Sequence, residues 1–357
     1  MSDFTILVEE YGTGHAVAAI KNGMLIDFLI DPEDKNESSL VGSIVTVKLN
    51  AVKKGINGTF VTLPGEKKGF LKGRHNLQAH SILPVYIGVT NDAYKAQPVS
   101  RQLFLKGRYV ILTPDRPGIN LSRKISSEDI RNNIQDALSK FEFSFLNKLG
   151  LIVRSQAAHV TIIDLIKEVE EKMAQYNLII EDNLSEPRTI IPPLKARDFA
   201  MLEWNYVEPY SYIEEESCFD RFSIWEQLYG FLRSRVDLQN GGFVIIEPTS
   251  ALIAVDINTG SDVSYAGALK TNLFAMKELP RQLEVRGLGG KIIVEFAPLF
   301  KSDRIKIEAE LQKALKKYKT QCILVGWTKL GNLELQKKRD KKPIAQMLKH
   351  DKRYQIF

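Results

Sequence analysis

Cysteine is scarce in this chain of 357 residues, which contains only Cys218 and Cys322. The two are far apart in the sequence, and neither belongs to a group with the spacing of metal ligands. Such usage excludes a disulfide framework and is typical of proteins kept in a reducing compartment. We therefore expect a cytoplasmic protein.

Signals for secretion or membrane insertion are missing as well. The N-terminal residues, MSDFTILVEEYG, contain no basic region followed by an apolar core, which argues against a signal peptide. No apolar run approaches the length of about 20 residues that is needed to span a bilayer. We expect no membrane partner.

Motifs of several common enzyme classes are also absent, namely GxxxxGK(S/T), HExxH and GxSxG. None of the five His residues has a partner at a useful spacing. These absences argue against a P-loop nucleotide site, a zinc protease and an α/β-hydrolase.

The chain does contain an excess of basic residues near its C-terminal end. Residues 300–357 hold 16 Lys and Arg against 6 Asp and Glu, a net charge of +10, whereas the whole chain carries +6. A basic region on a mildly acidic body favours contact with a polyanion. A solvated helix face would produce the same pattern.

Two apolar runs each end in an acid, Asp256 after residues 252–255 and Glu295 after residues 292–294. Between them, residues 266–285 carry Leu and Met at helical spacing. A strand–helix–strand unit of this kind predicts two parallel strands whose C-terminal ends share one edge of a sheet. We expect the two acids and Asn258 to face a common crevice there.

Two carboxylates and an amide are hard oxygen donors that suit Mg²⁺ or Mn²⁺. The competing interpretation is structural, with the acids capping neighbouring loops or pairing with Arg286 and Arg304. On spacing alone, the structural interpretation is slightly favoured.

The length and the 44% hydrophobic composition suffice for two or three modules. Residues 4–36 predict an antiparallel meander that runs into a polar linker over 31–39. From residue 41, short strands between Gly-rich turns predict a five-stranded barrel of the OB type.

Phe60 and Phe70 lie in the predicted barrel among basic residues, an arrangement that suits single-stranded nucleic acid. These cations are Lys48, Lys53, Lys54, Lys67, Lys68, Lys72 and Arg74. For a Phe in a strand, a place in the barrel core is the competing and commoner interpretation.

Residues 103–195 predict a further α/β unit. Its expected elements are strands over 107–113 and 150–155 and helices over 126–141 and 161–176. Arg154, beside Ser155, could hold a phosphate through a bidentate contact, or it could pair with an acid of the helix that follows. Beyond this unit we expect helices over 224–236 and 305–318 and a strand over 322–327.

Five segments of the chain, taken together, resemble the ribonuclease E/G family. They are Gly241–Glu247, Ala251–Thr259, Thr271–Leu273, Arg281–Gly290 and Leu330–Leu335. The composite is specific and strongest over residues 240–335, and it continues more weakly over the barrel and Gly150–Ser155, so that it covers nearly the whole chain.

The resemblance implies an α/β multi-domain fold, in which a ribonuclease H-like domain has an inserted S1 (OB-type) β-barrel and a 5′-sensor and is followed by a DNase I-like α/β nuclease domain. The implied boundaries are 1–36 and 196–238 for the two parts of the ribonuclease H-like domain, 37–103 for the barrel, 104–195 for the sensor-like domain, 239–345 for the catalytic domain and 346–357 for a basic C-terminal tail.

The resemblance also implies roles for single residues. Asp256 and Glu295 match ligands of a catalytic Mg²⁺ or Mn²⁺, and Asn258 matches a catalytic residue that orients a carboxylate. The matched RNA-binding residues are Phe60, Phe70 and Lys95, and those of the pocket that senses a 5′-monophosphate are Gly107, Ile111, Arg154 and Ser155.

Three departures from the family pattern matter. Glu295 stands where the family has Asp, which moves the carboxylate outward although Mg²⁺ demands near-ideal octahedral geometry. Cys322 stands where the sensor has an Arg, so sensing of the 5′ end should be weakened. A CPxC-type zinc link is absent, so we expect no zinc and either a monomer or an atypical dimer.

The predicted function is a metal-dependent endoribonuclease that cleaves single-stranded RNA in RNA processing or decay, leaving 5′-phosphate and 3′-hydroxyl ends. The alternative is an RNA-binding protein of the same family in which catalysis is weakened or lost. Glu295 and Cys322 motivate that alternative.

Overall fold

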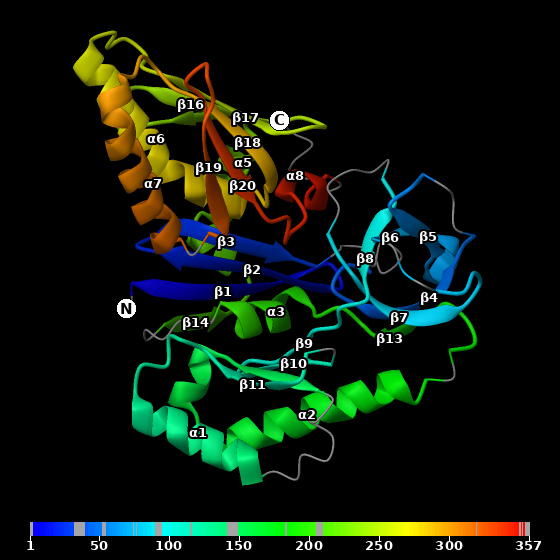
Figure 1. Ribbon diagram of the computed structural model, residues 1–357. Helices are drawn as coiled ribbons and strands as arrows, with labels where there is room; N and C mark the ends of the chain where they lie inside the picture. Colours follow the sequence, from blue (N-terminus) through cyan, green and yellow to red (C-terminus); the bar gives the residue numbers. More distant parts are fainter. Residues whose placement is uncertain are drawn as a thin grey trace. The chain divides into compact units, whose positions relative to one another are not determined.

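The computed structural model describes residues 3–31, 40–51, 55–73, 75, 77–89, 95–114, 116–140, 149–182, 184–204, 210–318, 320–349, 351 and 353. The chain divides into two compact units (Figure 1). A discontinuous unit combines Met1–Asp34 with Pro209–Phe357, and a continuous unit is Lys35–Glu208. The finer division into six segments stays a prediction.

The discontinuous unit begins with the predicted meander. Its strands β1 (Phe4–Tyr11), β2 (Gly14–Lys21) and β3 (Met24–Ile30) are antiparallel, and β14 (Ser211–Glu214) pairs with β1 in parallel. Apolar residues of the sheet, such as Phe28, pack on Phe219 of α4 (Cys218–Arg221) and on Trp225 of α5 (Ile224–Leu232).

The prediction of a helix over 224–236 is wrong at the C-terminal end of the helix. The helix α5 stops at Leu232, and the next strand, β15 (Arg235–Asp237), already includes Val236. Val236 pairs with Val244 in the neighbouring strand. Strand pairing of a β-branched residue thus overrides the apolar spacing that suggested a longer helix.

A six-stranded mixed sheet forms the larger part of the discontinuous unit. Its order is β15-β16-β17-β18-β20-β19, with β16 (Phe243–Pro248), β17 (Ile253–Asn258), β18 (Gly290–Glu295), β19 (Cys322–Trp327) and β20 (Leu333–Lys337). Within this sheet β17 and β18 are parallel, as predicted, and the other neighbours are antiparallel.

Helices α6 (Tyr265–Val285) and α7 (Arg304–Lys317), the latter preceded by η4 (Lys301–Asp303), cover one face of this sheet (Figure 1). Every second strand residue, among them Val255 and Val294, packs into a core with Met276 and Leu311 of these helices. The α6 helix starts after Ser264, whose side chain accepts a hydrogen bond from the Gly267 amide. The helix predicted over 266–285 is confirmed.

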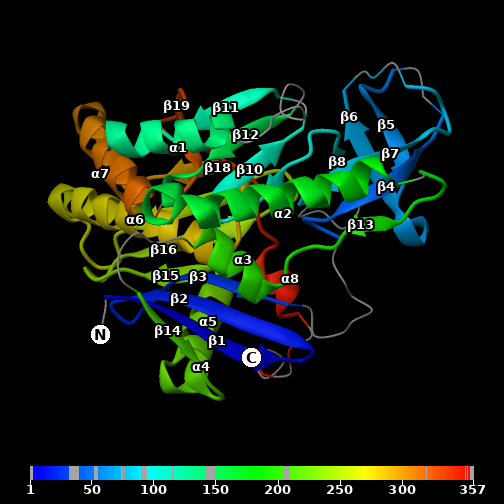
Figure 2. The same ribbon diagram turned by 90° about the horizontal axis from the view of Figure 1, so that it is seen from below.

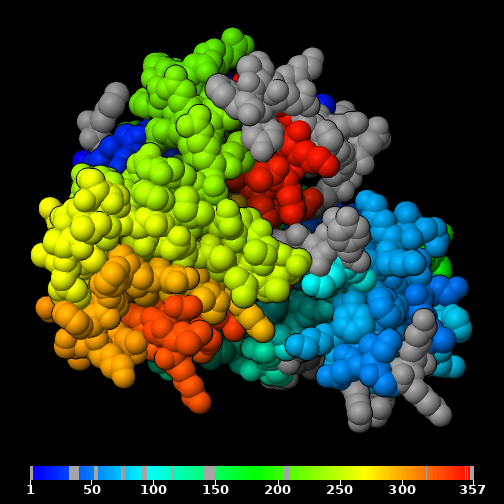
Figure 3. All heavy atoms as spheres, turned by 90° about the horizontal axis from the view of Figure 1, so that it is seen from above, coloured from blue at the N-terminus to red at the C-terminus, as the bar shows by residue number. Residues whose placement is uncertain are grey.

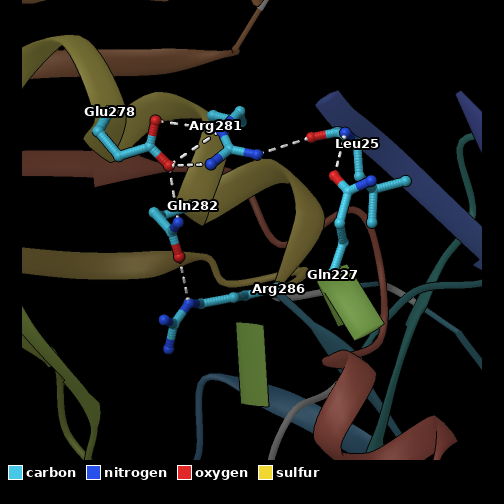
Figure 4. A network of polar contacts seen from close by, with 6 residues as sticks. All are labelled: Leu25, Gln227, Glu278, Arg281, Gln282 and Arg286. Carbon is cyan, nitrogen blue, oxygen red and sulfur yellow. Dashed lines mark hydrogen bonds and ion pairs between the residues drawn. The ribbon is translucent and has the colours of Figure 1, made fainter. Parts of the chain in front are cut away.

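Polar contacts also fix α6 to the smaller sheet (Figure 4). Arg281 binds the Glu278 carboxylate and donates through Nη1 to the Leu25 carbonyl of β3 at 3.0 Å. The Leu25 amide donates to Gln227 of α5 at 2.8 Å. Arg281 therefore ties the helix that connects β17 and β18 to a second part of the same unit.

The last described residues belong to the core of the discontinuous unit. Ile344 of α8 (Ile344–Met347) and Leu348 are buried in the cluster that includes Trp225. Arg353 lies 3.4 Å above the Trp225 ring and pairs with Asp351. In Figure 3 the red surface of this segment adjoins the yellow-green surface of the preceding helices. Of the predicted basic tail, residues 350, 352 and 354–357 lie outside the described residues.

The continuous unit contains a closed five-stranded barrel. Its strands are β4 (Ile44–Leu49), β5 (Gly58–Thr62), β6 (Lys68–Lys72), β7 (Ile82–Ile87) and β8 (Gln97–Ser100), with η2 (Pro64–Glu66) between β5 and β6. They pair in the order β4-β5-β6-β8-β7, and β7 pairs back with β4. The predicted OB-like barrel is confirmed, and it fits an S1 domain. A short strand, β13 (Thr189–Ile191), extends the edge of β4.

The rest of the continuous unit is a four-stranded sheet with helices beside it (Figure 2). The strands are β9 (Leu105–Lys106), β10 (Val110–Thr113), β11 (Gly118–Leu121) and β12 (Gly150–Val153), followed by η3 (Ser155–His159). The helices are α1 (Glu128–Lys140), α2 (Ile162–Ile180) and the shorter α3 (Ala196–Glu203). The strand expected over 107–113 is interrupted, because residues 107–109 form a turn between β9 and β10.

None of the described helices combines the length and the apolar character that crossing a bilayer requires.

Candidate active site

Asp256 and Glu295 lie opposite each other on the parallel strands β17 and β18. Both side chains are exposed, whereas Val255 and Val294, one residue earlier, face the helices. Since register partners point to the same face of a sheet and neighbouring strands are about 4.8 Å apart, the two carboxylates are close neighbours. The structure thus brings the two predicted acids together.

Asn258 is the third predicted residue at this edge. It stands two positions beyond Asp256 on β17, and its Nδ2 donates to Oδ2 of Asp256 at 2.9 Å. The amide therefore holds one carboxylate oxygen and leaves the other oxygen of Asp256 available.

One form of the structural interpretation paired the two acids with Arg286 and Arg304, and the other had them cap neighbouring loops. Nε of Arg286 donates instead to Gln282 at 2.8 Å, and the Arg304 guanidinium lies 4.5 Å above the Trp327 ring. Neither acid forms an ion pair with a described residue. Because like charges opposite each other on neighbouring strands are destabilising, this edge would be stabilised by a cation.

The donor set is therefore two carboxylates and one amide group on a single sheet edge. Among the described residues, no group of three or more His, Cys, Asp or Glu could hold a metal ion. The hard oxygens that are present fit Mg²⁺ or Mn²⁺, which bind proteins through one or two carboxylates and keep several waters.

Asn272 of α6 fixes the chain just beyond Glu295. Its side chain is wholly buried, donates to the Ala297 carbonyl at 3.0 Å and accepts from the Ala297 amide at 3.1 Å. This pair of hydrogen bonds resembles the pairing between two strands. It fixes the backbone at Ala297, two residues after Glu295. A buried amide with both groups satisfied is costly to replace.

Thr271, the residue before Asn272, fixes the other side of the site. Its Oγ1 accepts from Nδ2 of Asn240 at 2.6 Å, in the turn between β15 and β16. A Cβ on Gly242 would lie 2.6 Å from Thr271 Cγ2 and 2.8 Å from the Asn258 carbonyl oxygen, so this close approach requires glycine.

The sequence marked residues 271–273 only as part of the family resemblance, and their positioning role was missed. A signal was available, since two polar residues interrupt the apolar face of the predicted helix.

Phe60 and Phe70 are register partners on β5 and β6, with ring centroids 5.3 Å apart in an edge-to-face arrangement. Both are half-buried, whereas the next residues, Val61 and Leu71, fill the barrel core. Because successive residues of a strand point to opposite faces, the two rings lie on the outer face of the barrel. The core interpretation of this pair is therefore wrong.

Lysines flank this aromatic pair on the outer face. Lys68 and Lys72 are exposed on β6, two residues before and after Phe70, and Lys48 is exposed on β4. Lys95 is exposed two residues before β8, which pairs with β6. Three further cations predicted near the rings, Lys53, Lys54 and Arg74, lie outside the described residues.

Arg154, which follows β12, has two partners inside the continuous unit. Its Nη1 donates to the Gly107 carbonyl at 2.8 Å, and Nη2 donates to Glu203 at 3.0 Å. Lys106 reaches the other oxygen of Glu203 at 3.0 Å. The alternative in which Arg154 pairs with an acid of the helix that follows, α2, is wrong in its partner, because the acid belongs to α3.

Burial alone would raise the pKa of Glu203, but the charges of Lys106 and Arg154 outweigh it. The pKa of this carboxyl therefore lies below its ordinary value of 4.5. The group stays ionised and forms ion pairs with both Lys106 and Arg154.

The turn after β9 is occupied by a carboxylate of the chain itself. Glu168 of α2 accepts hydrogen bonds from the amides of Arg108 and Tyr109, both at 2.6 Å, and of Val110 at 2.9 Å. A Cβ on Gly107 would lie 2.6 Å from the Glu168 carboxyl carbon, so only glycine permits this approach. The amides of this turn are thus already bound to an anionic group.

The remaining residues matched to the sensor are less informative. Ile111 pairs with Lys106 and Ile152 within the sheet, and Ser155 is the half-buried first residue of η3. Cys322 begins β19 in the discontinuous unit, where burial raises the pKa of its thiol to about 11.

Comparison with known proteins shows where the chain belongs. The model of the Ribonuclease E/G family matches residues 104–198 and 195–340. Ribonuclease E of Nostoc sp. (strain PCC 7120) is 28% identical over 298 residues, which cover 71% of this chain and 42% of that protein. Ribonuclease G of Escherichia coli (strain K12) is 24% identical over 398 residues, which cover 93% of this chain and 79% of that protein.

A third relative, Ribonuclease E of Synechocystis sp., is 27% identical over 290 residues, which cover 69% of this chain and 42% of that protein. The chain thus spans less than half the length of these two ribonuclease E proteins. The family match covers well over half of the chain, and the predicted enzyme class, an endoribonuclease of the ribonuclease E/G type, is the class that the relatives' names give. The protein belongs to the ribonuclease E/G family.

Proposed function

We propose that this protein is a metal-dependent endoribonuclease that cuts single-stranded RNA at the edge formed by β17 and β18. The observation that carries the proposal is the pair Asp256 and Glu295, in register, exposed and without an ion pair to a described residue. Two adjacent anions on an RNA-cleaving family member are explained by a cation that binds between them and a phosphate.

The residues of this edge have distinct tasks in the proposal. Asp256 and Glu295 would hold the divalent ion, and Asn258 keeps the Asp256 carboxylate in one orientation through its 2.9 Å hydrogen bond. A bound Mg²⁺ or Mn²⁺ polarises a phosphoryl oxygen and lowers the pKa of a bound water. The products would be a 5′-phosphate and a 3′-hydroxyl.

Glu295 sets a geometric condition on the site. Its side chain is one methylene longer than that of Asp, and Asn272 fixes the backbone beyond it through Ala297. The extra length must therefore be absorbed by the side chain itself and not by a shift of the strand end.

RNA binding is assigned to the outer face of the barrel as well as to the catalytic edge. The partly exposed rings of Phe60 and Phe70 would stack on bases while Lys48, Lys68 and Lys72 neutralise phosphates. Binding should weaken with added salt, because these cations replace condensed counterions.

Cleavage of a labelled AU-rich single-stranded RNA by the purified protein tests the proposal. We expect cutting with Mg²⁺ or Mn²⁺, none in EDTA, and a loss of about 10²–10³-fold or more in Asp256→Asn, with RNA affinity retained. Glu295→Asp restores the family's residue and shows whether the longer side chain limits the rate. Lys291→Ala is a matched control, since Lys291 is exposed on the same strand at its far end.

The second candidate is an RNA-binding protein with weakened chemistry, which the Glu at position 295 favours. RNA binding without cleavage under either metal would support it and contradict the nuclease. The cytoplasmic location and the monomer or atypical dimer stay predictions.

A further inference from the structure

One face of the six-stranded sheet carries the candidate active site, and we call it the site face. It is the face opposite α6 and α7. Its strand residues alternate with those of the core, and they include Arg235, Asp237, Phe243, Ile245, Glu247, Ala254, Asp256, Asn258, Lys291, Ile293, Glu295, Ile323, Glu334 and Gln336.

Arg235 lies in the same row of the site face as the two acids. It is the register partner of Ile245, which is the partner of Asp256, which is in turn the partner of Glu295. With a strand spacing of about 4.8 Å, the Cα of Arg235 is about 10 Å from that of Asp256.

The guanidinium of Arg235 is held in a defined place. Its Cζ lies 3.7 Å from the centroid of the Phe243 ring, and its Nε donates to Oδ1 of Asp237 at 2.8 Å. Phe243 is the register partner of Asn258, so the ring lies directly beside the site residues. The Phe243 ring covers one face of the guanidinium and Asp237 binds its Nε. The two Nη groups of Arg235 are therefore left to bind another group.

The side chain of Arg235 is 53% exposed despite these two contacts. A guanidinium stacked on a ring and oriented by a carboxylate is preorganised to meet phosphate oxygens with both Nη groups. An exposed cation could serve solubility alone, but such a cation would need neither a ring nor an orienting acid.

The charge of the site face makes a cation at this place useful. Asp237, Glu247, Asp256, Glu295 and Glu334 are all acidic, and a polyanion approaching them is repelled. Arg235 lies in the row of the two candidate metal ligands, whereas Lys291 lies near the N-terminal end of β18, away from them.

We propose that Arg235, held by Phe243 and Asp237, binds a backbone phosphate of single-stranded RNA that flanks the scissile phosphate. This inference rests on the proposed function for the location of the scissile group. The contact positions the strand and carries no sequence information, as is usual for phosphate contacts. Phe243 and Asp237 act through Arg235 and are positioning residues.

Binding of a fluorescent single-stranded RNA to the full chain in EDTA tests the inference without cleavage. We expect Arg235→Ala to weaken binding about three- to tenfold and to reduce the slope of log affinity against log salt by about 0.7. Phe243→Leu should have a smaller effect of the same kind. Lys313→Ala is the matched control, because Lys313 is exposed on α7, which covers the opposite face of the sheet.

Oligonucleotides that each carry one neutral methylphosphonate identify the contact. One such linkage should weaken binding to the natural protein and leave binding to Arg235→Ala unchanged. An unaltered salt slope in Arg235→Ala, or coupling to an abasic site instead of to a neutral linkage, would overturn the phosphate assignment.

Cleavage in Mg²⁺ separates this inference from the proposed function. Arg235→Ala should raise KM with little change in kcat. If the natural protein does not cut RNA at all, the proposed function fails, while the binding experiments still decide the role of Arg235.

Discussion

Two regions of this protein use the same residue types in opposite ways. At the edge of β17 and β18, Asp256 and Glu295 are exposed neighbours that form no ion pair with a described residue. In the continuous unit, Glu203 is paired with two cations, and Glu168 accepts three backbone hydrogen bonds.

The difference in pairing distinguishes a carboxylate that stabilises the fold from one that is suited to bind a ligand. A charge that is already met by amides or guanidinium groups stabilises the fold, and a new anion must displace it. Two like charges that face each other cost stability, and a bound cation relieves that cost. The sheet edge is therefore suited to bind a cation, as proposed, whereas the turn after β9 is already occupied by Glu168.

The largest expected effect concerns the residue that positions the sheet edge. Asn272→Leu removes both hydrogen bonds to Ala297 and should lower cleavage about 10²-fold, because a small misplacement of a catalytic group is costly. It should also raise the metal concentration needed for half-maximal rate.

Gln282→Leu is a control for Asn272→Leu, since Gln282 is also buried on α6 but bonds Glu278 and Arg286. Single-turnover rates across a Mg²⁺ titration provide the measurement. An equal loss of activity in both variants would mean that Asn272 acts only through stability.

The next effect concerns the turn that Glu168 fills. Glu168→Ala leaves three amides without their acceptor and should lower the free energy of unfolding by about 2 kcal/mol. Asp256→Asn, by contrast, should leave stability in metal-free buffer unchanged or higher.

Urea unfolding of both variants measures this contrast, with Glu170→Ala as an exposed control on α2. A Glu168→Ala protein as stable as the natural one would contradict the view that this carboxylate is structural.

A smaller effect should depend on pH. The pKa of Glu203 is lower in the folded protein than its ordinary value of 4.5, so its ionised form stabilises the fold above that pH. This contribution is lost as the pH falls below about 4.5, through the folded pKa. The unfolding free energies of the natural protein and Glu203→Gln should differ by about 1 kcal/mol near neutral pH and converge in acid. Curves that stay parallel down to low pH would exclude the role of Glu203.

The smallest expected effect is that of the RNA 5′ end. Because Glu168 and Glu203 occupy the groups that a phosphate would use, and because Cys322 replaces an Arg of the family pattern, the 5′-monophosphate and 5′-hydroxyl forms of one RNA should be cut at similar rates. Competition between the two forms in one reaction measures the ratio. A large preference for the monophosphate would show that the pocket opens.

Local patterns predicted much of the fold. The β-branched run that ends in Asp256 and the helical spacing from Leu269 to Leu283 gave the strand and the helix of the catalytic edge, since burial dictates both periods. The barrel followed from short strands between Gly-rich turns. These features depend on neighbours in sequence.

Other features depend on partners far away in the chain and could not be predicted. Val236 became part of a strand because Val244 pairs with it, and Arg154 bonds Glu203 of α3 instead of an acid of α2. Arg235 belongs to no sequence motif, and it shares a row with Asp256 only because two strand pairings, β15 with β16 and β16 with β17, bring the residues into register.

Because one unit is discontinuous in sequence, it constrains the order in which the parts of the chain can fold during synthesis. The continuous unit, Lys35–Glu208, is complete before β14 leaves the ribosome, whereas β1 must wait for β14 as its parallel partner. Domains fold as units during synthesis, and pairing across long sequence distances is slow. The N-terminal meander, whose apolar residue Phe28 later packs on Phe219 and Trp225, is therefore the part of the nascent chain that must be kept from aggregation longest.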